Sequence, residues 1–442
     1  MIRDRSELAR TPAHEVALDC IEAGIDAAHP ARAMNEALER AGNELRIDGS
    51  TIDLDAYAEI VVVGGGKAAA GMARVLEDVL GDRPMEGVVV TNDPAETDRI
   101  AVIEGSHPTP NESGMEGAKR VLSLANRATE ESLVLCVLSG GGSALLPAPI
   151  EGIPLDDLRS VTDALLASGA TISEINAVRK HLSAIKGGRL TAAARPATVV
   201  SLLVSDVVGN DPSVIASGPT VPDDSTYDDA LAVLDRYDIS PPAAVGEILE
   251  AGAAGERPET PAAGDPVFDR TEVRVLADGF TALAAARTVA EEASYTPVIL
   301  SSRVEGEARE AAKTHAAIAA EVRATGNPAE PPVVLLSGGE TTVTIRGDGT
   351  GGPNQEFVLS GSLTTDSAGI TLASVDTDGS DGATDAAGAI VDRDTADDAR
   401  AARSALAAND AYPYLADRGA LIETGSTGTN VNDLRVLVID TA

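Results

Sequence analysis

The sequence predicts an α/β protein with two domains, and three observations support this prediction. The chain has 442 residues, which is more than one hydrophobic core usually serves. Short apolar runs alternate with stretches of helical periodicity, as is typical of parallel sheets covered by helices on both faces. Three of the apolar runs also end in glycine tracts, at residues 64–66, 140–142 and 338–339.

The first half of the chain predicts a Rossmann-like parallel sheet with helices on both of its faces. A helical stretch at 13–45 comes first, and alternating strands and helices follow it. The expected strands are 59–66, 86–93, 100–106, 133–142 and 197–206, and the expected helices are 67–80, 114–128 and two within 155–182 that break near Gly169.

The second half predicts a smaller α/β domain with a mixed sheet. Residues 241–270 are rich in Pro, Ala and Gly, so we expect a first domain at 1–245, a linker at 246–270 and a second domain at 271–442. Residues 332–347 are expected to form two strands joined by a short glycine turn, which makes the sheet mixed. The other expected elements are strands at 272–278, 295–302, 370–379 and 433–440 and helices at 281–293 and 305–324.

Charge and composition limit the classes of function. The net charge of −36 is spread along the chain and would repel nucleic acid. It favours a halophilic protein, whose self-repulsion strong salt screens; a plain acidic mesophilic protein is the alternative. No apolar run is long enough to cross a membrane, no signal-peptide core is visible and two cysteines are too few for a disulfide framework. We therefore expect a cytoplasmic protein.

Lysine is scarce, with five residues against 29 arginines. Three of these lysines lie in glycine-containing segments, namely Lys67 in "GGGK" and Lys180 and Lys186 in "RKHLSAIKGG". Glycine lets the backbone approach a ligand closely, so these lysines are candidates for binding an anion.

Glycine tracts after parallel strands can direct backbone N–H groups at an anion, at the start of the next helix. The stretch "VVVGGGKAAAGMA" fits this pattern. It is not a P-loop, because no Ser or Thr follows the lysine, and it lacks regular G-x-G-x-x-G spacing. A tight strand–helix turn is the alternative for any single tract.

Acidic residues form a second pattern. Asp376, Asp378 and Asp381 follow one apolar strand, and Asp206 and Asp211 follow another. Such carboxylates can bind Mg²⁺ or act as a general base, although most carboxylates in so acidic a chain are solvated loop residues. The "GSALL" segment lacks a nucleophile elbow. Anion sites, basic residues and carboxylates together indicate phosphoryl transfer.

Long segments resemble the glycerate 2-kinase family with its C-terminal MOFRL domain. They are "VVVGGGKAAAGMA", "EGSHPTPNESG", "VLSGGGSALLPAP", "EINAVRKHLSAIKGGRL", "SLLVSDVVGNDPSVIASGPT", "LLSGGETTVTI", "GGPNQEFVLS", "TDGSDGATDAAGAIVD" and "TGSTGTNVNDLRVLVI". The resemblance implies two α/β domains with the active site in a cleft between them. It also implies ATP- and Mg²⁺-dependent phosphorylation of D-glycerate to 2-phosphoglycerate.

The resemblance implies roles for individual residues. Lys67 and Asp206 would be catalytic. The substrate would be bound by Ser139, Gly140, Gly141, Gly142, Ser143, Arg179, Lys180 and Lys186. The nucleotide would be bound by Gly65, Gly66, Asp211, Gly338, Gly339, Glu340, Asn354, Gln355, Glu356 and Asn430. The metal ligands would be Asp376, Asp378 and Asp381.

One position departs from the family pattern. Pro353 stands where many relatives have Arg in "GGRNQE", so another arginine, for which Arg346 is a candidate, would have to replace it.

Two other functions remain open. An NAD(P)H-dependent hydroxypyruvate reductase would need an acid about 20 residues after its glycines, near Asp82. A non-catalytic sensor of nucleotides or sugar acids is the third possibility. The expected partners are D-glycerate and ATP, with no nucleic acid or membrane and with a homodimer left open.

Overall fold

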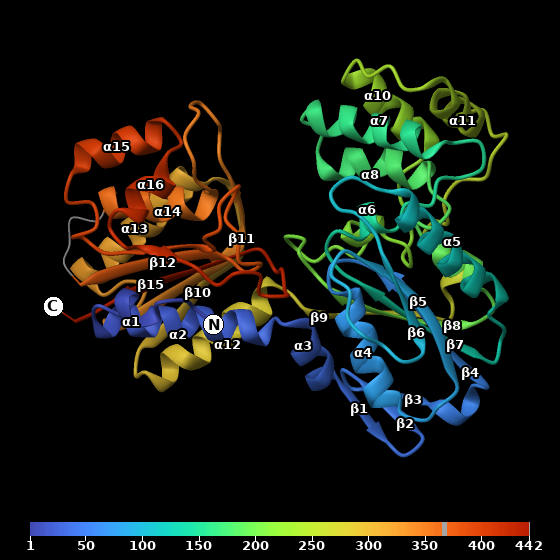
Figure 1. Cartoon of the computed structure of the whole chain (residues 1–442), viewed down its shortest axis with the longest axis horizontal. Helices are drawn as coiled ribbons and strands as arrows, with labels where there is room; N and C mark the ends of the chain where they lie inside the picture. The colour runs from blue at the N-terminus through green and yellow to red at the C-terminus, as the bar shows by residue number, and fades with distance from the viewer. Residues whose placement is uncertain (365–368, 442) are drawn as a thin grey trace. The chain divides into compact units, whose positions relative to one another are not determined.

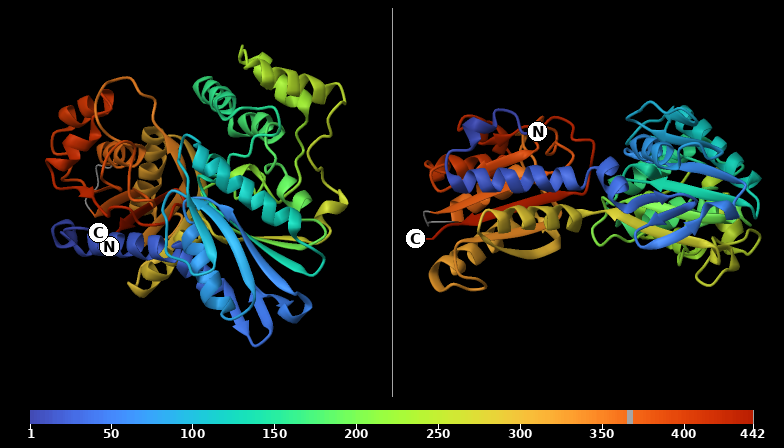
Figure 2. Two further views of the ribbon diagram at one scale, coloured as in Figure 1. Left: turned by 45° about the vertical axis from the view of Figure 1, so that its right-hand side comes forward. Right: turned by 90° about the horizontal axis from the view of Figure 1, so that it is seen from below.

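The structure is a computed structural model that describes residues 1–364 and 369–441. The chain divides into two compact units, which can be followed by colour in Figures 1 and 2. We call Ala33–Leu276 the parallel-sheet unit, and Met1–Arg32 together with Ala277–Ala442 the mixed-sheet unit.

The parallel-sheet unit is built on six strands in the order β6-β5-β4-β7-β8-β9. Their bounds are β4 (Glu59–Gly65), β5 (Met85–Thr91), β6 (Ile100–Glu104), β7 (Ser132–Leu138), β8 (Thr198–Val204) and β9 (Thr271–Ala277). The pairs from β6 to β8 are parallel. The chain order reverses between β4 and β7, and in open α/β sheets ligands bind at such a switch point. A separate antiparallel sheet contains β1 (Leu38–Ala41), β2 (Glu44–Ile47) and β3 (Ser50–Asp53).

Some helices of this unit pack against the sheet and others form a separate group around their own core, and short polar side chains fix where several of them begin. The helices are α3 (Pro30–Ala37), α4 (Ala69–Leu80), α5 (Glu112–Arg127), α6 (Gly142–Leu145), α7 (Leu155–Ala167), α8 (Ile172–His181), α9 (Arg189–Ala194), α10 (Tyr227–Arg236) and α11 (Ala243–Ala253), with 3-10 turns η1 (Leu54–Ala56), η2 (Ile215–Ser217) and η3 (Pro266–Phe268). Asn111 caps α5, and Thr171 forms a capping box with Glu174 at α8, which satisfies N–H groups that a helix start leaves open. Cys136 is fully buried in the core of this unit.

The mixed-sheet unit also has six strands, in the order β10-β11-β15-β12-β13-β14. They are β10 (Thr296–Glu307), β11 (Val333–Thr342), β12 (Ile370–Asp376), β13 (Gly388–Val391), β14 (Leu421–Ile422) and β15 (Asp433–Ile439). Only the β10–β11 pair is parallel. Figure 1 shows α2 (Pro12–Ala27) and α12 (Gly279–Glu292) on one face, opposite α13 (Ala308–Thr325), α14 (Pro353–Thr364), α15 (Ala399–Ala407) and α16 (Ala411–Ala416); α1 (Arg5–Leu8) precedes α2.

The predicted fold class is confirmed, and so is the helix break near Gly169, which falls between α7 and α8. The single helix expected at 13–45 was wrong, because the chain forms α2, α3 and β1 there. The turn expected within 332–347 was also wrong. Gly338 and Gly339 lie inside the one strand β11, which pairs with β10 and β15 on its two sides.

The units divide the chain at other points than the expected domain boundaries. Residues 1–32 join the C-terminal half because α2 packs against α12. Gly24 permits this approach, since a Cβ there would lie 3.1 Å from Ala282 O on α12. Strand β9 completes the parallel sheet beside β8 instead of opening the second sheet. The expected linker at 246–270 contains most of α11 and a 3-10 turn at Pro266–Phe268. Among the described residues, no helix has the length and apolar character needed to cross a membrane.

Candidate active site

The first glycine tract joins β4 to α4, and its glycines let two strand ends approach each other. Gly64 and Gly66 have φ of 147° and 142°, which favour glycine. A Cβ would lie 1.9 Å from Val137 O at Gly64 and 2.2 Å from Ser139 Oγ at Gly66. The amides that open α4 are also used within the protein, because Lys67 N donates to Gly140 O at 2.8 Å and Ala68 N to Ser139 Oγ at 3.0 Å. The turn therefore anchors the loop after β7 and orients Lys67.

The second glycine tract follows β7 at the switch point and has side chains on both sides. A Cβ on Gly140 would lie 2.0 Å from Asp206 Oδ2. One on Gly141 would lie 3.0 Å from His107 Cδ2 and 3.3 Å from Lys67 Cγ. The N–H groups of Gly140 and Gly141 have no acceptor among the described residues. This loop therefore brings a carboxylate, an ammonium and an imidazole together beside two open N–H donors.

The charges in this group affect one another. Burial raises the pKa of the Asp206 carboxyl, and the positive charge of Lys67 only partly opposes this effect. Burial also lowers the pKa of the His107 imidazole, and Lys67 lowers it further. A half-buried carboxylate with a raised pKa is a stronger base than an ordinary Asp, so Asp206 suits general base chemistry.

Two further cations, Lys186 and Arg179, lie next to this loop and have no acidic partner among the described residues. Lys186 is 3% exposed, and its Nζ donates to Ser143 O at 3.0 Å. Burial, followed by the charge of Arg179, lowers the pKa of Lys186 to about 7. Burial also lowers the pKa of Arg179, and its guanidinium makes no hydrogen bond or ion pair within the described part of the chain. In a protein of net charge −36, this unneutralised cation pair marks a place for an anion.

Two residues predicted for this site lie elsewhere. Lys180 is buried and its Nζ is 3.0 Å from Asp223 Oδ1. Its charge is already neutralised, so its surroundings indicate a structural role and not substrate binding. Asp211 is exposed in the loop after β8 and accepts from Ser213 N at 2.9 Å, an ordinary turn contact.

Sequence reasoning missed two polar residues of this site, Asn176 and Ser217. Ser217 donates to Asn176 Oδ1 at 2.8 Å, and its hydroxyl is 2.7 Å from that of Ser143. The available signal was spacing, since Asn176 precedes Arg179 by three positions on α8 and such residues share a helix face.

In the mixed-sheet unit, Asp381 caps a helix. Its carboxylate accepts from Asn354 N at 3.0 Å, Asn354 Nδ2 at 3.2 Å and Gln355 N at 2.8 Å, all at the start of α14. Burial raises the pKa of Asp381 to about 7. Asn354 also donates to Asp433 Oδ1 at 2.7 Å, and Asp433 in turn pairs with the fully buried Arg435. These contacts join α14 to the sheet, so the side chains of Asn354 and Asp381 have structural roles within this unit.

Other predicted nucleotide contacts also have internal partners. Glu356 accepts from Arg309 Nε at 3.1 Å and Asn409 Nδ2 at 2.8 Å. Gln355 Nε2 donates to Thr384 Oγ1 at 2.8 Å, and Asn430 Oδ1 accepts from Asn432 N at 2.9 Å.

The remaining predicted positions in this unit lie in β11, in the loop after it and at the start of α14. Gly338 and Gly339 are buried in β11, whereas Glu340 is exposed on the same strand. Pro353 begins α14, a position that proline favours. Arg346 is exposed.

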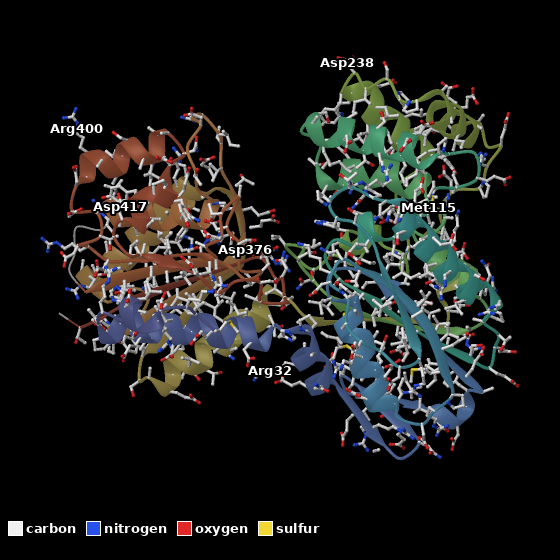
Figure 3. The ribbon with its side chains drawn as sticks, in the orientation of Figure 1. Arg32, Met115, Asp238, Asp376, Arg400 and Asp417 are labelled. Carbon is white, nitrogen blue, oxygen red and sulfur yellow. The ribbon has the colours of Figure 1, made fainter. Side chains whose placement is uncertain are left out.

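The three carboxylates predicted to bind Mg²⁺ do not fit a preformed metal site. Asp376, at the end of β12 (Figure 3), accepts from Asp378 N, and Asp378 accepts from Ser380 N. Burial and the neighbouring charge of Asp378 raise the pKa of Asp376. Within the described ranges, no group of three or more His, Cys, Asp or Glu side chains is arranged to hold a metal ion.

Fold and site together define a two-unit α/β enzyme. Two family models match the chain: one described as a domain of unknown function (DUF4147) over residues 16–250, and one described as the MOFRL family over residues 333–433. The glycerate 2-kinase of Pyrococcus horikoshii is 41% identical over 96% of this chain and 97% of its own length. A putative hydroxypyruvate reductase of Agrobacterium vitis is 46% identical over 86% of this chain and 99% of its own.

A solved structure supports the same assignment. The crystal structure of a glycerate kinase from Thermotoga maritima matches with a TM-score of 0.85 at 39% identity, covering 96% of this chain and 99% of that one. The chain therefore belongs to the glycerate 2-kinase family, a family of kinases.

Proposed function

We propose that the protein transfers a phosphoryl group from ATP to the 2-hydroxyl of D-glycerate, giving 2-phosphoglycerate and ADP. The supporting observation is the placement of Asp206 and Lys67 beside Gly140 and Gly141, at the switch point of the parallel sheet. The name of the Pyrococcus relative agrees with this reaction.

In the proposed mechanism Asp206 accepts the proton of the substrate hydroxyl. Its raised pKa makes it a better base, and general base catalysis works best when the base pKa approaches the working pH. The hydroxyl oxygen then attacks the terminal phosphorus of ATP, and the bond to the leaving ADP oxygen breaks. Lys67 and the open N–H groups of Gly140 and Gly141 stabilise the negative charge on the transferring group.

The nucleotide contacts on the mixed-sheet unit are part of the proposal, with Gly338, Glu340 and Asn430 as the positions to test. Mg²⁺ is proposed to arrive with ATP, because Mg²⁺ in such sites usually binds substrate phosphates and only one or two carboxylates. The carboxylates of the described residues form no preformed metal site, so the proposed steps depend on Asp206, Lys67 and the loop N–H groups.

The reductase alternative takes its support from the name of the Agrobacterium relative. In a dinucleotide-binding fold, the pyrophosphate sits on the N–H groups that open the helix after the first strand. Here the corresponding groups of Lys67 and Ala68 donate to Gly140 and Ser139. Asp82, the acid that the reductase would need, lies in the turn between α4 and β5 and not at the end of a strand. Its side chain is 94% exposed. These observations favour the kinase.

The deciding experiment incubates the protein with Mg-ATP and D-glycerate in molar KCl and follows the products by phosphorus NMR. A 2-phosphoglycerate signal is expected. A 3-phosphoglycerate signal would overturn the proposed substrate orientation but not the kinase reaction. Folded protein that gives neither product, yet oxidises NADH with hydroxypyruvate, would establish the alternative.

A further inference from the structure

Five residues next to the Gly140–Gly141 loop, which we call the ring, take no part in the proposed phosphoryl transfer step. Hydrogen bonds link four of them, and Arg179 joins them through its charge beside Lys186. They come from four segments of the parallel-sheet unit: α8, the start of α6, the turn at residue 186 and the 3-10 turn η2. The ring consists of Asn176, Arg179, Lys186, Ser143 and Ser217.

The first part of the ring is a hydrogen-bonded chain of neutral groups. The Ser143 and Ser217 hydroxyls are 2.7 Å apart, and Ser217 donates to Asn176 Oδ1. This bond fixes the Asn176 amide with its NH₂ group directed away from Ser217. Asn176 is 2% exposed, and its Nδ2 has no hydrogen-bond partner among the described residues. A buried donor without an acceptor is destabilising unless a ligand or water satisfies it.

The second part of the ring is the cation pair. Lys186 donates one of its three N–H groups to Ser143 O, which leaves two N–H groups. Arg179 lies close enough to Lys186 for its charge to act on it, and it shares a helix face with Asn176. The buried Lys186 and the half-buried Arg179 repel each other. Since neither has an acidic partner among the described residues, a bound anion would relieve that repulsion.

We propose that the donor groups of Asn176, Arg179 and Lys186 bind the carboxylate of the small hydroxy-acid substrate. This inference rests on the proposed function. A planar carboxylate matches the fork of donors that a guanidinium presents, and Asn176 supplies a further N–H. Ser143 is three residues beyond Gly140, and a Cβ on Gly140 would lie 2.0 Å from Asp206 Oδ2, so a carboxylate bound here would lie near Asp206. The ring would thereby select an acid over an uncharged polyol and orient its hydroxyl.

The test measures the KM for D-glycerate and the KM for ATP separately in Arg179→Ala and Asn176→Asp. The second variant places a negative charge where a carboxylate should bind. We expect the KM for D-glycerate to rise about 10- to 100-fold in each, as for loss of a hydrogen bond to a charged group, with little change in the KM for ATP. Arg120→Ala and Asn126→Asp make the same changes on exposed positions of α5 and should leave both values unaltered.

Isothermal titration of D-glycerate without nucleotide separates this inference from the proposed function. If the wild type yields no phosphoglycerate but binds D-glycerate, and Arg179→Ala abolishes that binding, the carboxylate subsite stands and the kinase proposal fails. If the wild type is an active kinase and the variants raise only the KM for ATP, the ring binds phosphate and the inference is wrong. Should Asn176→Asp unfold, Arg179→Gln at the half-buried neighbouring position provides the same comparison.

Discussion

Gly140→Ala tests whether the position of Asp206 matters for catalysis, because this substitution adds one methyl group directly against its carboxylate. The new Cβ would lie 2.0 Å from Asp206 Oδ2 and 2.6 Å from its Cγ. Ordinary contacts begin near 3.4 Å, so the carboxylate must move away by about 1.4 Å. The backbone at Gly140 is not in the left-handed region, so alanine causes no strain of its own there.

The expected loss of activity follows from this displacement. A misplacement of about 1 Å lowers an enzymatic rate by about 100-fold, so kcat should fall by about that factor while the KM for ATP changes little. Overpacking of this kind destabilises by about 1–3 kcal/mol, and thermal unfolding must confirm that the variant is folded at the assay temperature. Initial rates are measured as ADP release at saturating ATP and D-glycerate.

The matched control is Gly71→Ala in the nearby helix α4. A Cβ on Gly71 has no heavy atom within 4 Å, and alanine in place of a helical glycine stabilises by about 0.5–1 kcal/mol. This control should keep the wild-type kcat with an equal or higher Tm. A folded Gly140→Ala protein whose kcat stays within a few-fold of wild type would refute the role of Asp206 as base.

Three further predictions concern charge. Lys67→Ala should lower kcat by about 100- to 1000-fold, as expected for loss of one donor to the transferring group, and a KM effect alone in a coupled ADP assay would contradict the proposed role. The pKa of Asp381 is raised from 3.8 to about 7 in the folded protein. The folded state therefore holds a proton that the unfolded chain has released, and this contribution to stability, about 4 kcal/mol, is lost as the pH rises from about 4 to 7. Urea unfolding across that range should show the loss in the wild type and a flatter profile in Asp381→Asn; equal slopes would contradict it. Finally, the net charge of −36 predicts that Tm rises between 0.1 and 2 M KCl, where the screening length falls from about 10 Å to below about 3 Å, and a Tm independent of salt would argue against a halophilic protein.

The elements of the parallel sheet were predictable because their signals are local. Buried strands such as β7 and β8 are continuous apolar runs, and a polar residue that follows such a strand lies at the edge where α/β sheets bind ligands. This argument made Asp206 a candidate, and the glycine tract made Lys67 one, without knowledge of any contact; their catalytic roles came from the family resemblance. Asp381 also follows an apolar strand, but its carboxylate caps α14. Order along the chain therefore placed these residues near strand ends but did not determine their partners.

The role of Lys180 shows why partners were harder to predict. Its charge is neutralised by Asp223, 43 residues later in the chain, and no pattern around either residue indicates that pair. Asn176 and Ser217 present the opposite case, because their polar atoms belong to the site only through contacts between α8 and a distant turn. Likewise, the place of β9 beside β8 depends on strand order, which an apolar heptapeptide does not encode.

The three glycine tracts share one sequence pattern but have three different physical causes. A glycine in these tracts indicates that there is no room for a Cβ at that position. Only the folded structure shows which atoms occupy the space that the Cβ would need. At Gly64 and Gly66 it is the neighbouring strand end, and at Gly339 it is the backbone of Val304 on β10. At Gly140 and Gly141 it is the side chains of the site, and there the N–H groups lack an acceptor within the described residues. Because a bound anion needs free donors as well as space, the open N–H groups, more than the glycines themselves, support the proposal that the loop after β7 binds the anion.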